Sequence, residues 1–261
     1  MDSQKVSEGD NILLSFGTHR TYLVKVEAGR SFHTHKGYVR FDDIIGRDYG
    51  DCVKSSLNVP FIMMKPLLRD YIIKCARQTQ INYPKDIALI VMFSNIGPGS
   101  QVVEAGTGTG ALTTAIAHYI RPTGTVHSYD IRDEFQKTAE KNLKRAGLNQ
   151  LVELKLKDVT EGIDEVDVDA VILDLAVPWL VVPHAYAALK PCRSLVSFSP
   201  TIDQVVKTVE ALKENGFTDV ETVECMMRGM QTDRGKTRPQ TLMTGHTGYI
   251  TYARKTTKRL N

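Results

Sequence analysis

The stretch Val102-Val-Glu-Ala-Gly-Thr-Gly-Thr-Gly110 decides the fold of this 261-residue chain. Its apolar start predicts a buried strand over Gln101–Ala105, and a helix is expected to begin at about Ala111. The first two glycines let the backbone approach a ligand, and the third lets the helix pack closely on the strand. Such a strand-turn-helix unit places a ligand at the carboxyl end of a parallel sheet.

The glycine spacing separates two classes of ligand. A dinucleotide site uses Gly-x-Gly-x-x-Gly, whereas here Glu104 is followed by glycine at every second position. This tighter turn, opened by an acid, favours a cationic amino-acid ligand without a pyrophosphate. The next predicted strand, Thr125–Tyr129, ends at Asp130, whose carboxylate can accept hydrogen bonds from both hydroxyls of a ribose. Together these features resemble class I S-adenosylmethionine-dependent methyltransferases, and a nicotinamide oxidoreductase is the weaker alternative.

The composition indicates a soluble, cytoplasmic protein. Lys and Arg number 33 and Asp and Glu 30, so the bulk charge does not indicate a polyanion partner. From Cys225 to Asn261, however, eight basic residues face one acid, which predicts a solvated tail or a phosphate-contacting surface. No apolar run is long enough to span a membrane, and no signal-like segment is expected. The four cysteines are scattered and are expected to be buried small side chains, although a hyperthermophilic source would make disulfides an alternative.

Residues 1–80 are expected to form a small β-rich, barrel-like domain. Short β-prone runs at Asn11–Phe16, Tyr22–Val26 and Tyr38–Phe41 are separated by turns, and a helical stretch follows near Pro66–Gln78. His33 and His35 lack a third ligand, so no metal site is predicted. The segment carries twelve basic and nine acidic residues, a mild excess that would suit RNA contact.

Residues 81–261 are expected to form the catalytic domain. Helices and strands alternate from Pro84 onward, and two strands in succession end the pattern, Val220–Met227 and Gly248–Ala253. This pattern predicts a Rossmann-like, doubly wound sheet with an antiparallel hairpin at one edge.

Four acids follow or end predicted strands of that sheet: Glu104, Asp130, Asp158 and Asp174. Each could instead cap the helix that follows it, a common role for aspartate. Because the carboxyl ends of parallel strands meet at one edge, four acids in this arrangement favour a ligand site.

The motif Asp174-Leu-Ala-Val-Pro-Trp179 resembles the substrate-side motif of the TrmI family of tRNA (adenine-N1)-methyltransferases, most closely the archaeal members. Three further stretches match the family, namely Tyr83-Pro-Lys-Asp86, the glycine turn, and Arg238-Pro-Gln-Thr241 with Gly245-His-Thr-Gly-Tyr-Ile250. Ala176 replaces a proline usual in the motif, Asp130 stands where many members carry Glu, and Cys192-Arg193 replaces a Gly-Gly turn.

The resemblance implies a cofactor, S-adenosyl-L-methionine, and a substrate, the T-loop of tRNA with its adenosine 58 and in some archaeal enzymes also 57. It implies a homotetramer and no metal. Asp174 would stabilise the adenine, which becomes cationic as N1 is methylated. Tyr83 would offer the flipped base a stacking face or hydroxyl, and packing on the sheet at the start of a helix is the alternative for this residue. Arg238, His246, Pro178 and Trp179 would lie on the RNA side, although packing in the core is the alternative for Trp179. The residues expected at the cofactor are Glu104, Gly106, Thr107, Gly108, Thr109, Gly110, Asp130, Ile131, Asp158, Val159 and Asp174.

Two alternatives remain within related chemistry. The first is a class I methyltransferase acting on protein or a small molecule, and the second is a non-catalytic RNA-binding subunit of such an enzyme. A non-catalytic subunit would be expected to have lost the glycine turn, Asp130 or Asp174, and all three are intact here.

Overall fold

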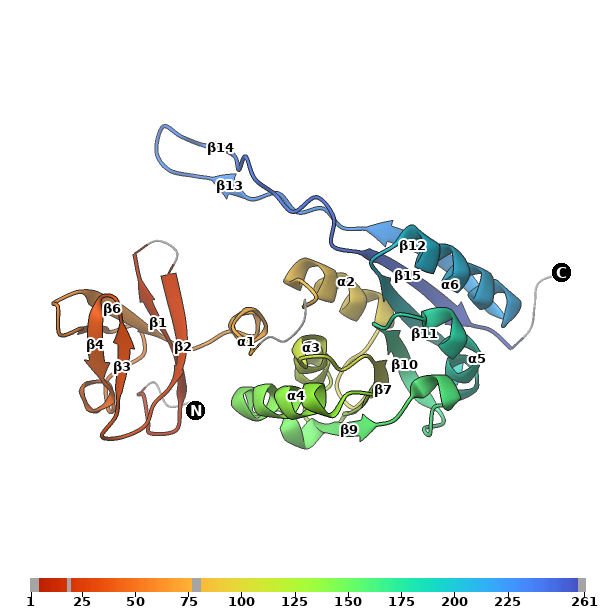
Figure 1. Ribbon diagram of the computed structural model, residues 1–261, viewed down its shortest axis with the longest axis horizontal. Helices are drawn as coiled ribbons and strands as arrows, with labels where there is room; N and C mark the ends of the chain where they lie inside the picture. Colours follow the sequence, from red (N-terminus) through yellow and green to blue (C-terminus); the bar gives the residue numbers. More distant parts are fainter. Residues whose placement is uncertain (1–4, 18–19, 77–80, 258–261) are drawn as a thin grey trace. The chain divides into compact units, whose positions relative to one another are not determined.

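The central feature is a seven-stranded sheet in the order β12-β15-β11-β10-β7-β8-β9 (Figure 1). The computed structural model describes residues 5–17, 20–76 and 81–257. The chain divides into two compact units, Met1–Cys75 and Ala76–Asn261. The boundary predicted between residues 80 and 81 falls beside residues 77–80, which lie outside the described part.

The first unit contains a four-stranded antiparallel sheet in the order β2-β1-β6-β5 and a separate hairpin, β3-β4. Ile12, Leu14, Val39, Phe61 and Met63 from both sheets fill a common core. The elements are β1 (Asn11–Phe16), β2 (Arg20–Lys25), β3 (Ser31–Thr34), β4 (Gly37–Arg40), β5 (Cys52–Lys54), β6 (Pro60–Met64), the short 3-10 helix η1 (Phe41–Asp43) and α1 (Leu68–Ile73). The predicted strands are present within two residues, whereas the helix is shorter than expected, with residues 77 and 78 outside the described ranges.

In the second unit, five neighbouring strands of the sheet are parallel and β15 runs antiparallel to both of its neighbours. The strands are β7 (Gln101–Ala105), β8 (Thr125–Asp130), β9 (Val152–Leu156), β10 (Val168–Leu173), β11 (Leu189–Ser199), β12 (Phe217–Glu224) and β15 (Tyr249–Lys255). The predicted doubly wound fold with an edge hairpin is confirmed, and β15 lies one place inside the edge strand β12. Every residue of β10 is buried because helices cover both faces of the sheet.

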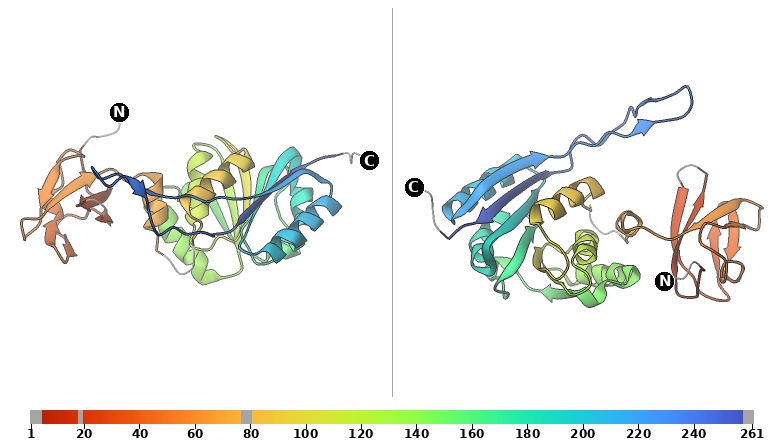
Figure 2. Two further views of the ribbon diagram at one scale, coloured as in Figure 1. Left: turned by 90° about the horizontal axis from the view of Figure 1, so that it is seen from above. Right: turned by 180° about the vertical axis from the view of Figure 1, so that it is seen from behind.

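The helices α2 (Pro84–Ser94), α3 (Ala111–Tyr119) and α4 (Asp133–Ala146) cover one face, and α5 (Pro178–Ala188) and α6 (Ile202–Glu214) cover the other (Figures 1 and 2). Local sequence sets their ends. Pro84 occupies the first turn of α2, and Thr201 caps α6 by accepting from the Gln204 N–H. Gly147 ends α4 in a left-handed conformation.

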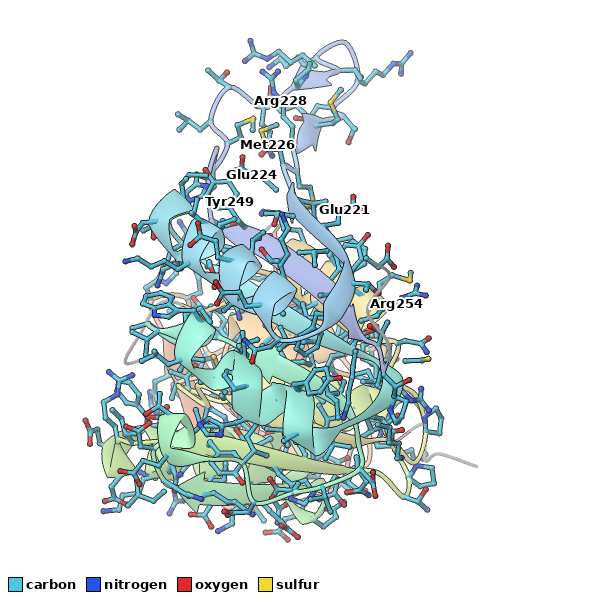
Figure 3. The ribbon with its side chains drawn as sticks, turned by 90° about the vertical axis from the view of Figure 1, so that its right-hand side faces the viewer. Glu221, Glu224, Met226, Arg228, Tyr249 and Arg254 are labelled. Atoms are coloured by element: carbon cyan, nitrogen blue, oxygen red, sulfur yellow. The ribbon has the colours of Figure 1, made fainter. Side chains whose placement is uncertain are left out.

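Residues 225–247, between β12 and β15, form a protruding segment that we call the arm (Figure 3). It contains the short strands β13 (Met230–Gln231) and β14 (Arg238–Pro239), and its residues 226–246 are all exposed. The expectation that these basic residues form a tail was therefore wrong, and the alternative of a phosphate-contacting surface stays a prediction. Four of the eight basic residues lie on the arm, Arg254 and Lys255 belong to β15, and the last two lie outside the described residues.

The cysteines also differ from expectation. Cys52 and Cys192 are exposed, Cys75 and Cys225 are partly exposed, and all four are free thiols. Cys52 points outward from the edge strand β5, and Cys192 has a φ of 63° where β11 bends, a conformation that suits glycine. Cys192 therefore occupies an exposed, left-handed position within β11 and not a core position. Among the described helices, none is long and apolar enough to cross a membrane.

Candidate functional site

The glycine turn between β7 and α3 has a backbone that only glycine permits at two positions. A Cβ on Gly106, where φ is 100°, would lie 1.9 Å from the carbonyl oxygen of Asp174. A Cβ on Gly110 would lie 3.0 Å from that of Ala139 in α4. The first glycine thus brings the ends of β7 and β10 together, and the last lets α3 approach α4.

Asp130, the last residue of β8, closes this turn. Its Oδ2 accepts from the Gly108 N–H at 2.9 Å and its Oδ1 from the Arg132 N–H at 3.0 Å. The side chain is buried, yet each carboxylate oxygen can accept a further hydrogen bond. It is therefore placed to hold ribose hydroxyls while bracing the loop.

Glu104 lies beneath the turn, fully buried. Thr113 and Ser128 donate to its Oε2, both at 2.6 Å, and its Oε1 is buried without a hydrogen-bond partner among the described residues. Burial is the main cause that raises the pKa of this carboxyl to about 8; the two hydroxyl donors oppose it, and the nearby carboxylates of Asp174 and Asp130 add to it. Glu104 borders none of the cavities described below, so a cationic group bound above the turn would act on it through its charge, by favouring the ionised carboxylate.

Asp158 differs from the other three acids because it is exposed and caps the 3-10 helix η3 (Val159–Glu161). Its Oδ1 accepts from the hydroxyl of Thr160 at 2.7 Å and from the N–H of the same residue at 2.9 Å. These bonds lower the pKa of the carboxyl. The alternative that an acid caps the following helix thus holds for Asp158, although this residue also borders a cavity.

Three adjoining cavities lie at the carboxyl edge of the parallel strands, and Asp174 borders all of them. We call them the turn, adenosine and base cavities. The turn cavity is lined by Ile81, Asn82, Gly106, Thr107, Gly108, Thr109, Ala111, Leu112, Asp130, Arg132 and Asp174. The adenosine cavity is lined mainly by 129–132, 157–160 and 174–177 with Gly106 and Leu180, and so includes the expected Ile131 and Val159. The base cavity is lined by Ile81, Asn82, Tyr83, Asp174, Phe198, Pro200 and Thr247.

Asp174 follows β10 and is held in place by its neighbours. Its N–H donates to the carbonyl of Ala105 at 2.8 Å, and its Oδ2 accepts from Nδ2 of Asn82 at 2.9 Å. Protein surrounds the carboxyl, although part of the residue opens onto the cavities. Burial raises its pKa to about 6, the Asn82 bond opposes that rise, and the charge of Asp130 adds to it. The Asp174 side chain is thus mostly ionised at neutral pH and becomes protonated in mildly acidic solution.

Tyr83 is 41% exposed and stands at the start of α2, on the wall of the base cavity. Sequence reasoning missed its neighbours in that cavity: Asn82, Phe198, Pro200 and Thr247. Asn82 stands next to a residue that was singled out, and Phe198 to Pro200 follow the predicted end of a strand. Thr247 belongs to the Gly245–Ile250 stretch that matched the family, but it was not assigned to a cavity.

A buried polar network joins α2 to both ends of the arm. The ammonium of Lys85 donates to Oδ1 of Asp86 at 2.7 Å, to the carbonyl of Cys225 at 2.6 Å and to the hydroxyl of Thr247 at 2.6 Å. The Thr247 hydroxyl in turn donates to Oδ2 of Asp86 at 2.9 Å. The Lys85–Asp86 pair of the Tyr83–Asp86 motif therefore connects the wall of the base cavity to both ends of the arm.

The four residues expected on the RNA side are not brought together. Pro178 is buried at the start of α5, and Trp179 packs beneath the ammonium of Lys207, 4.9 Å from its ring; neither borders the base cavity. Arg238 lies on the arm. His246 is bound by two acceptors.

Both ring nitrogens of His246 face an acceptor, Nδ1 the Glu224 carboxylate at 2.6 Å and Nε2 the carbonyl of Pro200 at 2.9 Å. These partners, Glu224 first, raise its pKa. The imidazolium form satisfies both bonds, so His246 anchors Pro200 at the base cavity and does not itself line it.

The residues present fit a nucleoside cofactor that carries an amino acid and a positive charge. The acids of the turn and adenosine cavities can accept from hydroxyls and amines, whereas the expected cofactor residue Glu104 lies beneath the turn, borders neither cavity and can act on a bound cation only through its charge. Within the described ranges, no three His, Cys, Asp or Glu side chains gather in a way that could hold a metal ion.

Known proteins match both units. The sequence pattern of the family described as "tRNA methyltransferase complex GCD14 subunit" matches residues 61–237, and that of "TrmI-like N-terminal" matches 5–53. A tRNA (adenine(57)-N(1)/adenine(58)-N(1))-methyltransferase TrmI of Methanocaldococcus jannaschii is 40% identical over 90% of this chain and 91% of its own.

Two solved structures share the fold over nearly the whole chain. A SAM-dependent O-methyltransferase of Thermotoga maritima is 33% identical, with a TM-score of 0.93, over 99% of this chain and 97% of its own. The tRNA (m1A58) methyltransferase TrmI of Aquifex aeolicus is 30% identical, with a TM-score of 0.84, over 97% of this chain and 100% of its own. These matches confirm the predicted resemblance, and the chain belongs to the GCD14/TrmI family of tRNA methyltransferases.

Proposed function

We propose that this protein transfers a methyl group from S-adenosylmethionine to N1 of adenine in the T-loop of tRNA, at position 58 and also at 57. The observation that carries this proposal is the single carboxylate, Asp174, at the junction of three cavities beside the glycine turn. The relative from M. jannaschii is named for methylation at both positions.

The turn and adenosine cavities would hold the cofactor. Bound S-adenosylmethionine supplies a methyl group on a positively charged sulfur. Asp130 would accept from its ribose hydroxyls, and Asp158, whose Oδ1 is occupied by Thr160, would use Oδ2 for the adenine amine. Glu104 would ionise beneath the charged amino-acid end. Ile131, Val159 and the peptides of the turn would line the remaining surface.

The base cavity would receive a flipped adenine. Its N1 already carries an in-plane lone pair, so no base has to remove a proton before the transfer. The reaction instead leaves the ring positively charged, and a carboxylate held 2.9 Å from a fixed amide is positioned before that charge develops. Asp174 would accept from the exocyclic amine and stabilise the cationic ring. Tyr83 would offer a stacking face at the cavity wall.

The arm suits contacts with both RNA and further copies of the chain. It carries Arg228, Arg234, Lys236 and Arg238 against one acid, which suits phosphates. It also exposes five large apolar side chains: Met226, Met227, Met230, Leu242 and Met243. Such exposure favours burial between subunits, and we propose a cytoplasmic homotetramer. Light scattering of the purified protein would measure its mass.

Incubation with cofactor and an unmodified tRNA transcript tests the function. We expect m1A at positions 58 and 57, mapped by mass spectrometry of nuclease fragments. A transcript with guanosine at both positions is the matched control. The structural relative named as an O-methyltransferase provides the competing outcome. Methylation of a ribose hydroxyl, or none with any tRNA, would refute the proposal.

A further inference from the structure

Within the described part of the chain, no Lys, Arg or His forms an ion pair with Asp174. Two cations in this region of the second unit serve other acceptors. Arg132 lies 3.6 Å from Asp130 with its guanidinium over the ring of Phe135, and the ammonium of Lys85 is bound to Asp86 and two oxygens beside the arm.

The surroundings of Asp174 disfavour its ionisation. Burial is the main cause, and the negative charge of Asp130 at the end of β8 acts in the same direction. A protonated Asp174 would lose the charge that the proposed reaction requires. The site therefore needs a neutral donor that favours the carboxylate.

Asn82 is placed to be that donor. Its side chain is 7% exposed, lies immediately before Tyr83 and Pro84 at the start of α2, and borders both the turn and base cavities. Because its Nδ2 holds Oδ2 of Asp174, it also determines which oxygen remains available to a base. A hydrogen bond from an amide is stronger to an ionised carboxylate than to a neutral acid, so this contact favours the anion.

We propose that Asn82 is a positioning residue that keeps Asp174 ionised and directs its Oδ1 to the base cavity. This inference rests on the proposed function. It assigns Asn82 a role that is transmitted through Asp174 and requires no contact with the substrate.

The experiment compares Asn82→Leu, which keeps the shape and removes the donor, with Asn82→Ala. Asn149→Ala, at the exposed first residue of the 3-10 helix Asn149–Leu151 that follows α4, is the matched control. The first readout is the ionisation of Asp174 in the protein alone, followed by carbon-13 NMR of labelled aspartate carboxyls. Asp174→Asn assigns the signal.

We expect the pKa of Asp174 to rise from about 6 to about 7 in both Asn82 variants, a tenfold change in its ionisation constant, and to stay unchanged in Asn149→Ala. The second readout is the single-turnover methylation rate at saturating cofactor and tRNA between pH 6 and 9. The Asn82 variants should be about fivefold slower than wild type at pH 6 and should recover most of that loss at pH 9.

A titration of Asp174 that does not move in either folded variant would overturn the inference. A rate that falls by the same factor at every pH would overturn it as well, because a purely structural defect has that signature. A wild-type protein that methylates no tRNA would instead refute the proposed function, while the NMR titration, which needs no substrate, would still decide the role of Asn82.

Discussion

Replacing Glu104 with glutamine should abolish a proton release that accompanies cofactor binding. With a pKa of about 8, Glu104 holds its proton in about nine of ten molecules at pH 7. A cation placed at the turn favours the ionised form, so binding should release up to about 0.9 proton from this residue. Asp174, with a pKa of about 6, contributes only about 0.1. Glutamine has no proton to lose, yet its oxygen can accept from Thr113 and Ser128 as Glu104 does.

Calorimetry at pH 7 in two buffers of different ionisation enthalpy measures this release directly. The wild type should release roughly 0.5–0.9 proton for each cofactor bound, and Glu104→Gln no more than about 0.1. Glu140→Gln, at an exposed position paired with Lys144 on α4, should behave as the wild type. Equal release from Glu104→Gln and wild type, or none from the wild type, would refute the argument.

The same shift makes stability depend on pH. The pKa of Glu104 is raised in the folded state above its unfolded value of about 4.5, so the folded protein binds the extra proton between pH 4.5 and 8. The free energy of unfolding should therefore fall as the pH rises through that window. Glu104→Gln should remove this component, worth up to about 5 kcal/mol across the window, and flatten the profile measured by denaturant unfolding.

Three further variants test the site. Asp174→Asn should leave cofactor affinity nearly intact and slow single-turnover methylation by about 10²–10³, because only the charge is lost; a rate within about threefold of wild type would make Asp174 merely structural. Asp130→Ala should weaken cofactor binding by about 1.5–3 kcal/mol in calorimetry, and unchanged affinity would remove it from the ribose site. Arg234→Ser with Lys236→Ser on the arm should reduce the salt dependence of tRNA affinity by a slope of about 2, and an unchanged slope would exclude phosphate contact there.

The cofactor side of the site could be predicted from sequence because local rules place it. A strand that ends at an acid and a turn whose glycines permit close approach are visible in short windows, and Asp130 and Asp174 lie where these windows predict. The burial of Glu104 could not be predicted in the same way, because it depends on Ser128 from the neighbouring strand. The rule that acids at strand ends bind ligands is ambiguous for Asp158. This residue follows a strand, as a ligand-binding acid would, but its side chain caps η3.

The substrate side could not be predicted because its contacts join distant parts of the chain. Thr247 reaches the base cavity through Asp86, a separation of 161 residues, and Pro200 is held there by His246. The family resemblance identified the Tyr83–Asp86 motif, but it did not indicate which groups the Lys85 side chain contacts. The basic tail was mistaken because charge counting does not distinguish a free end from a hairpin that returns to the sheet.

The buried ammonium of Lys85 has a consequence for how such enzymes change over evolution. It donates hydrogen bonds to both ends of the arm, to the Cys225 carbonyl where the chain leaves the sheet and to the Thr247 hydroxyl where it returns. The distance between these two ends is therefore set by the hydrogen bonds of Lys85 and not by the residues between them. Between residues 226 and 245, and so apart from His246, which anchors Pro200, such an insert can lengthen, shorten or exchange its sequence without disturbing the base cavity. The arm is thus the part of the molecule in which new RNA specificity can arise at little cost to catalysis.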